Sequence, residues 1–108
     1  MNRDILVACS TFPEMETARR IAHQLVTDKL AACANLVPAV ESIYYWQGKV
    51  ENAAEVLGVF KTMVSRYPAF EERLKELHPY DVPEILCFGI EGGFQEYLDW
   101  VKAGCSPG

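Results

Sequence analysis

The sequence has few basic residues and no long hydrophobic run, and each shortage excludes a class of function. Ten lysines and arginines against fifteen acidic residues give a formal net charge of −5. This balance argues against nucleic acid or an anionic membrane surface as a partner. No stretch approaches the roughly 18 apolar residues that a membrane-spanning helix needs. We therefore expect neither a nucleic acid partner nor a membrane partner.

The four cysteines also lack any motif spacing. Cys9, Cys33, Cys87 and Cys105 lie far apart, with no CxxC or zinc-ribbon spacing. The first three have apolar neighbours, and we interpret them as buried free thiols, the usual state in a reducing compartment. The opening MNRDILVACS has too short an apolar run for a signal peptide. We therefore expect a cytoplasmic protein.

Length and composition predict a single globular domain over residues 1–108. Half of the residues are hydrophobic and about a quarter are charged, which is typical of a soluble protein with its own core. We place the core at about 4–102. The remaining segment, 103–108, is expected to be a flexible tail in which Cys105 is exposed.

The hydrophobic pattern predicts an alternation of strands and helices. The expected elements are a strand at 4–11, a helix at 13–30, strands at 31–46 and 50–63, a helix at 67–78, a strand at 84–90 and a helix at 94–103. The two middle strands form a long hairpin that turns at Gly48. In the last helix we expect four side chains to face inward: Phe94, Tyr97, Leu98 and Val101.

This order, β-α-β-β-α-β with an additional C-terminal helix, indicates an α+β ferredoxin-like fold with an antiparallel sheet. Both crossover helices then cover the same face of the sheet. The strands ILVAC, EVLGVF and ILCFGI carry apolar side chains on both faces, so the second face needs a partner. A symmetric homo-oligomer would supply it, with the long hairpin pairing with a neighbouring chain.

The topology also predicts which residues meet at each end of the sheet. Three residues share one end: Cys9 near the end of the first strand, His78 at the end of the second helix and Glu84 at the start of the last strand. Cys33 and Lys61 fall at the opposite end. Cys9 and His78 can therefore approach each other within one subunit.

The segment HPYDVPE has two interpretations. A thiolate from Cys9 and an imidazole from His78 suit copper or zinc, with Glu84 or Asp81 as oxygen donors. Alternatively, the segment is a stiff connection between helix and strand: His78 caps the helix, Asp81 closes a turn and Tyr80 packs. The spacing alone leaves both open.

The hairpin and its strand ends are also ambiguous. Tyr44, Tyr45 and Trp46 would form either an aromatic pocket or interface anchors. Lys61 would hold an anion or lie in solvent. Catalysis has little support: GxSxG, HExxH and P-loop motifs are absent, and a Cys9–His78 pair has no orienting third group. We therefore do not expect an enzyme.

The blocks LAACAN, YYWQGK, EVLGVFKT and HPYDVPE, in this order, resemble the CutA family of divalent-cation tolerance proteins. The resemblance spans about residues 5–102. It implies a cytoplasmic homotrimer with intersubunit hairpin contacts and a role in tolerance of copper or other divalent cations. It also implies copper binding by Cys9 and His78, with Glu84 as our additional candidate ligand. Some relatives have a second histidine immediately before His78, where this chain has Leu77.

The shape that the resemblance implies is similar to that of the trimeric PII signalling proteins, which bind nucleotides and metabolites between subunits. This analogy of fold gives an alternative function, a metabolite- or nucleotide-sensing trimer. A third hypothesis is a structural role, in which the rigid trimer is a scaffold that binds a membrane or a thiol-exchange partner. The candidate residues for an intersubunit cleft are Tyr45, Trp46, Lys61, Tyr80 and Asp81.

Overall fold

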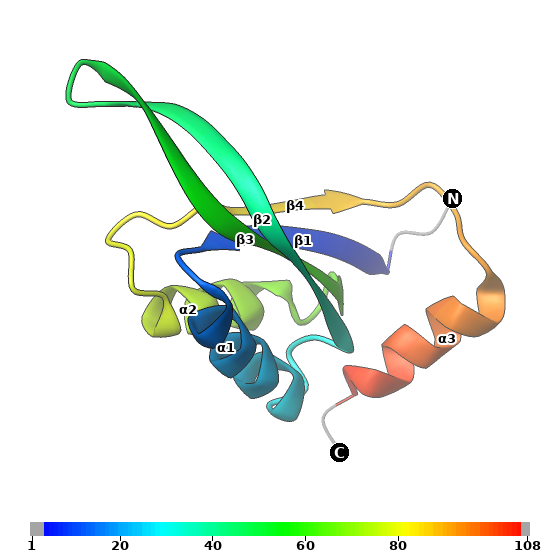
Figure 1. Ribbon diagram of the computed structural model, residues 1–108. Coiled ribbons are helices and arrows are strands. Elements are labelled where there is room, and N and C mark those ends of the chain that lie inside the picture. The colour runs from blue at the N-terminus through cyan, green and yellow to red at the C-terminus, as the bar shows by residue number, and fades with distance from the viewer. Residues whose placement is uncertain (1–3, 107–108) are drawn as a thin grey trace.

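The computed structural model of the chain describes residues 4–106 (Figure 1). Its elements are β1 (Ile5–Phe12), α1 (Met15–Thr27), β2 (Cys33–Trp46), β3 (Lys49–Met63), α2 (Tyr67–Leu77), β4 (Ile85–Gly89) and α3 (Gln95–Gly104). All predicted strands and helices are present, and their ends lie within a few residues of the predicted ones. Residues 107–108 of the predicted tail lie outside the described residues.

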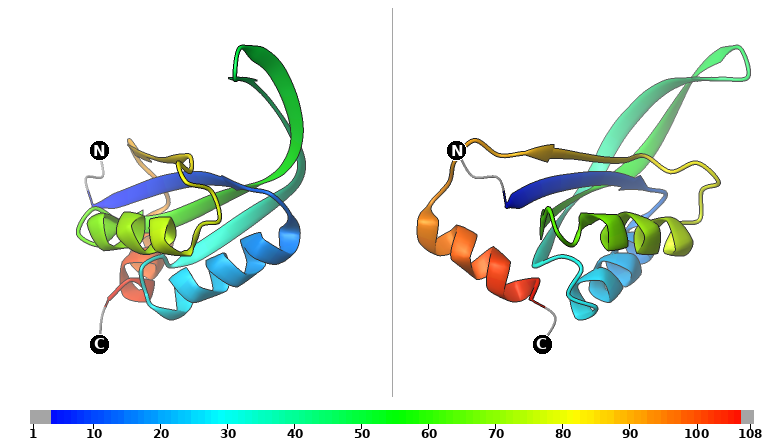
Figure 2. Two further views of the ribbon diagram at one scale, coloured as in Figure 1. Left: turned by 90° about the vertical axis from the view of Figure 1, so that its left-hand side faces the viewer. Right: turned by 180° about the vertical axis from the view of Figure 1, so that it is seen from behind.

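The strands form one antiparallel sheet in the order β2-β3-β1-β4. Helices α1 and α2 lie side by side on one face of this sheet, as Figure 2 shows from two directions. Helix α3 lies at the end of the sheet where β1 begins (Figure 1). The α+β ferredoxin-like fold with an extra C-terminal helix is therefore confirmed.

The core lies between the sheet and the two crossover helices because side chains alternate along each strand. On β1, Ala8, Ser10 and Phe12 are fully buried. The ring of Phe12 packs edge-on against Phe60, and Phe60 packs in the same way against Phe70, with centroids 6.5 and 5.2 Å apart. The helix-facing side of β1 is thus a buried layer, in which Ser10 is a polar residue between Ala8 and Phe12.

The opposite face of the sheet is apolar but uncovered over much of its area. Cys9 lies on this face, because its neighbours in sequence point into the core. Leu86 pairs with Cys9 and Phe88 pairs with Val7, so both share the face. Leu86 and Phe88 are 58% and 55% exposed. Within the described residues, one chain leaves this face open, as the sequence predicted.

The hairpin of β2 and β3 is the longest feature of the fold and extends well beyond the rest of the sheet (Figure 1). Gln47 and Gly48 both have positive φ angles, 50° and 80°, which match the strand twist in a two-residue turn. The predicted turn at Gly48 is confirmed. An irregularity between Val37 and Val40 interrupts the pairing register of β2 and β3. It includes Pro38, which has no backbone N–H to donate to the neighbouring strand.

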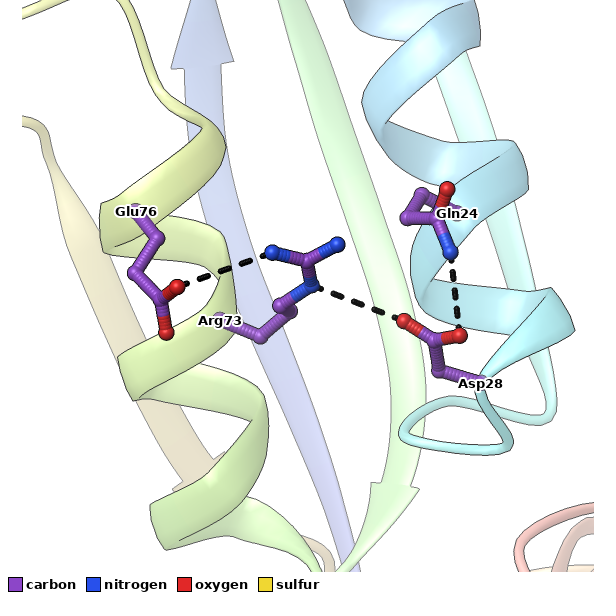
Figure 3. Close-up of polar contacts among 4 residues, drawn as sticks. All are labelled: Gln24, Asp28, Arg73 and Glu76. Carbon is purple, nitrogen blue, oxygen red and sulfur yellow. Dashed lines mark hydrogen bonds and ion pairs between the residues drawn. The ribbon is translucent and has the colours of Figure 1, made fainter.

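One ion pair at the surface connects the two crossover helices, and a second lies within α2. Figure 3 shows Arg73 of α2 between Asp28 and Glu76, at 3.6 Å from each carboxylate. Gln24 of α1 donates a hydrogen bond to the other oxygen of Asp28. These groups are more than one-third exposed, so the pairs contribute little to stability.

Among the helices within 4–106, none combines the length and the apolar character needed to cross a bilayer.

The segment around Cys105 is more buried than the sequence predicted. Helix α3 continues to Gly104, and Cys105 is fully buried against Ile5, Leu98 and Val101. The expectation of an exposed Cys105 was therefore wrong. The reason is that α3 folds back onto the ends of β1 and β3, where its last turn buries apolar side chains.

Two other expectations about side-chain burial were wrong. Phe94 and Tyr97 are 71% and 40% exposed, because Phe94 only precedes α3 and Tyr97 stacks on Trp100 at its surface. Cys87 is exposed because it lies on β4, an edge strand that has β1 as its neighbour in the sheet. All four cysteines are free, which was predicted for Cys9, Cys33 and Cys87, but Cys9 and Cys33 are only partly buried.

Candidate functional site

His78 is the C-cap of α2 and makes three backbone contacts. Its own N–H donates to the carbonyl of Leu74. The ring nitrogen Nε2 lies 2.8 Å from the Thr11 carbonyl oxygen, and Nδ1 lies 3.2 Å from the backbone nitrogen of Tyr80. A carbonyl only accepts and a backbone amide only donates, so Nε2 carries the proton and Nδ1 accepts. Both ring nitrogens are therefore occupied.

The His78 ring is also packed between two aromatic rings. It stacks on Phe12 with centroids 5.1 Å apart and planes inclined by 16°. The centroid of the Tyr80 ring lies 4.8 Å from that of the His78 ring, with the two planes inclined by 45°. The imidazole is 7% exposed. These contacts give His78 a structural role, but its ring bonds to Thr11 and Tyr80 and does not cap the carbonyls of α2 as the structural interpretation predicted.

Burial lowers the pKa of His78 below its ordinary value of 6.5, although the Thr11 carbonyl and the charge of Glu55 oppose this shift. A second proton would also have to sit on Nδ1, where it would face the N–H of Tyr80. The folded protein therefore holds His78 in its neutral form to lower pH than the unfolded chain does.

The free energy of unfolding is expected to decrease as the pH falls below about 6.5. In this window the unfolded chain binds a proton on His78 that the folded chain does not, so acid favours unfolding. Urea denaturation at about pH 7.5 and about pH 5.0 measures the effect. The variant His78→Gln should show a smaller loss between the two pH values. Equal losses in both proteins would contradict the assignment to His78.

Cys9 lies on the open side of the sheet, and Glu84 is near enough to influence its thiol electrostatically. Burial, and secondly the charge of Glu84, raise the pKa of the Cys9 thiol. The thiol is therefore protonated at neutral pH, and a metal that binds there has to displace its proton. His78 packs on Phe12, which points to the opposite side of β1.

The three predicted metal ligands thus divide into two groups. Cys9 and Glu84 are close enough to influence one another, while the His78 ring is hydrogen-bonded at both nitrogens. Within residues 4–106, no three histidine, cysteine, aspartate or glutamate side chains gather as a metal-binding group. The described residues of one chain do not fit a complete copper centre, so this ligand set stays a prediction.

A groove with a cavity volume of about 780 Å³ lies between the hairpin and the connection from α2 to β4. Both segments are at the same end of the molecule (Figure 1). The side chains that give the groove its chemical character are three aromatic residues and three acids: Tyr44, Trp46, Tyr80, Glu55, Asp81 and Glu84. The Tyr80 hydroxyl donates to Glu55 Oε2 at 2.7 Å, which connects the α2–β4 loop to β3.

Three of the five predicted cleft residues line this groove: Trp46, Tyr80 and Asp81. The other two do not. Tyr45 is 77% exposed on the hairpin, and Lys61 donates to Asn35 near the other end of β3. Within the described chain, no lysine or arginine lines the groove.

Sequence reasoning missed Glu55 as a groove residue. A signal for it existed, because Glu55 interrupts an alternating apolar pattern on β3 formed by Ala53, Leu57 and Val59. A carboxylate on a largely apolar strand face indicates a polar partner. The structure identifies that partner as the hydroxyl of Tyr80.

The fold and groove define a class of protein: an α+β subunit with an open antiparallel sheet, a projecting hairpin and an acidic, aromatic groove beside it. The family model of the CutA1 divalent ion tolerance protein matches residues 6–104. The chain belongs to this family.

Known relatives and structures agree with this assignment. The chain is 49% identical over 96 residues to the divalent-cation tolerance protein CutA of Thermus thermophilus, covering 89% of this chain and 93% of that protein. It is 44% identical over 97 residues to the chloroplastic protein CutA 1 of Oryza sativa, covering 90% of this chain but 55% of that protein. The chain thus spans about half the length of this plant relative.

Solved structures share the whole fold. CutA from Xylella fastidiosa superposes with a TM-score of 0.93 at 36% identity, covering 95% of this chain and 99% of that one. CutA1 from Oryza sativa gives 0.93 at 41% identity, covering 97% and 96%. At these identities the likeness extends from the fold to the family.

Proposed function

We propose that the protein is a cytoplasmic homotrimer that binds copper or another divalent cation and contributes to metal-ion tolerance. Membership of the CutA1 divalent ion tolerance family supports this class of function. The four free cysteines are consistent with a reducing compartment. We expect no enzymatic activity.

The uncovered face of the sheet supports self-association. Leu86 and Phe88 on β4 and Val37 on β2 are exposed apolar side chains on this face. The outer hairpin adds Ile43, Tyr45 and Val50, all more than half exposed. Apolar surface of this extent is usually covered in a functional assembly, and most soluble homo-oligomers have closed symmetry.

The observation that carries the metal proposal is the Cys9 thiol on the open face, where the charge of Glu84 contributes to raising the pKa of the thiol. Sulfur and carboxylate oxygen are metal ligands, and the soft sulfur favours Cu(I). In the trimer, a ligand from a neighbouring chain would complete the site, since the intrachain hydrogen bonds of His78 occupy its nitrogens. His78 joins the site only if one of those bonds breaks.

An anaerobic copper titration of the reduced protein against a competing chelator tests this proposal. We expect uptake at an integral ratio per trimer that is lost in Cys9→Ser and weakened in Glu84→Gln. The exposed thiol of Cys87 provides a matched control, and Cys87→Ser should bind as wild type. His78→Gln decides whether His78 is a ligand. Weak uptake, or equal uptake by the Cys9→Ser and Cys87→Ser variants, would overturn the site.

The alternative of a PII-like nucleotide sensor has one observation in its favour, the groove beside the hairpin. Its lining opposes an anionic ligand, however, because Glu55, Asp81 and Glu84 contribute carboxylates. Lys61, which the sequence offered as the basic group, lies away from the groove. A nucleotide is therefore the less favoured ligand.

A further inference from the structure

The groove beside the hairpin has the size and the lining of a small-molecule site. Its volume of about 780 Å³ lies in the range of known ligand pockets. Its acidic side chains are Glu55, Asp81 and Glu84, and no basic side chain within residues 4–106 lines it. We propose that this groove binds a small organic ammonium ion.

The aromatic side chains of the groove distinguish an organic cation from a metal ion. Tyr44, Trp46 and Tyr80 offer aromatic surfaces, and the negative face of an aromatic ring attracts ammonium groups. Metal ions instead need several oxygen, nitrogen or sulfur ligands that converge at about 2–2.5 Å. The described residues hold no group of three such ligand side chains. The groove therefore suits a cation that carries its own carbon substituents.

Glu55 is the carboxylate that the structure holds most firmly. It is partly buried on β3, and the Tyr80 hydroxyl donates to Oε2 at 2.7 Å. Burial, and then the contact with Glu55, raise the pKa of Tyr80 far above its ordinary value. Tyr80 thus remains a neutral donor and fixes the position of the carboxylate. One oxygen is used in this bond, and the other can face an ammonium group.

This inference is independent of the metal proposal. Trp46, Glu55 and Tyr80 carry it, and none of them belongs to the proposed metal ligands. Only Glu84 takes part in both the groove and the candidate metal site. The two sites can therefore be tested with different variants.

Titration calorimetry or NMR at constant ionic strength, on the assembled wild-type protein, tests the proposal. The probes are tetramethylammonium, which relies on aromatic faces, and n-butylammonium, which also donates hydrogen bonds to carboxylates. Their neutral counterparts are tert-butanol and n-butanol. We expect saturable binding of at least one ammonium ion and none of the alcohols. Which ammonium binds identifies the type of ligand.

Matched variants locate the binding. Glu55→Gln and Trp46→Ala should each weaken it roughly tenfold, because each removes a charge or an aromatic face. Glu41→Gln and Trp100→Ala, which change the same residue types outside the groove, should bind as wild type. Three results would each overturn the proposal: no saturable binding of either ammonium, equal binding by all four variants, or displacement of the ammonium by Mg²⁺ at equal ionic strength.

Discussion

Replacing His78 with alanine is expected to lower the free energy of unfolding by about 2–4 kcal/mol, even without metal. The substitution removes a ring stacked on Phe12 and leaves the Thr11 carbonyl and the Tyr80 amide without their partner. It also leaves a cavity where the ring was 7% exposed. Urea denaturation of the metal-free protein, at one protein concentration, measures the loss.

A matched control separates this structural role from a role in metal binding. His23 is an exposed histidine on α1, and His23→Ala should change the stability by less than about 0.5 kcal/mol. If His78 served only as a metal ligand, His78→Ala would leave the metal-free protein as stable as the wild type. Equal stability of the two alanine variants would therefore refute the structural role.

Replacing Gly58 with alanine is expected to destabilise the protein by about 1–3 kcal/mol through overpacking. A Cβ atom at this position would lie 2.8 Å from Phe12 Cε2 and 2.9 Å from Phe60 Cε1. Both phenylalanines are fully buried in the core, so neither ring can move without displacing its neighbours. Because His78 stacks on Phe12, a shift of the Phe12 ring would also displace the His78 ring.

Gly89 provides the control for Gly58. It also lies on a strand, β4, but a Cβ atom there would meet nothing within 4 Å. Gly89→Ala should therefore be neutral or slightly stabilising, because alanine restricts the unfolded chain. Thermal and denaturant unfolding of both variants gives the comparison. A loss for Gly89→Ala as large as that for Gly58→Ala would show that overpacking is not the cause.

The sequence predicted the fold because its signals are local. Short apolar runs rich in β-branched and aromatic residues placed the strands, helical spacing of apolar residues placed the helices, and Gly48 placed the hairpin turn. The order of the elements then left the ferredoxin-like topology as the natural arrangement. The exposure of Cys105 was predicted wrongly, since its burial depends on where the last helix folds back.

The candidate site could be predicted only in part. The sequence brought Cys9, His78 and Glu84 to one end of the sheet, and the structure agrees to that extent. The sequence did not predict that the rings of His78 and Phe12 lie on one side of β1 and the Cys9 side chain on the other. The stacking of His78 on Phe12, away from Cys9, follows from the alternation of β1 together with the path of the loop after α2.

The sequence by itself determined the order of elements, the family and the chemistry available in HPYDVPE and YYWQGK, because these depend on residue type and spacing along the chain. Only the tertiary structure decided which groups meet. It joined Tyr80 to Glu55 across 25 residues and His78 to Thr11 across 67. Such contacts depend on how strands and loops pack in three dimensions, and spacing along the chain carries no direct record of that packing.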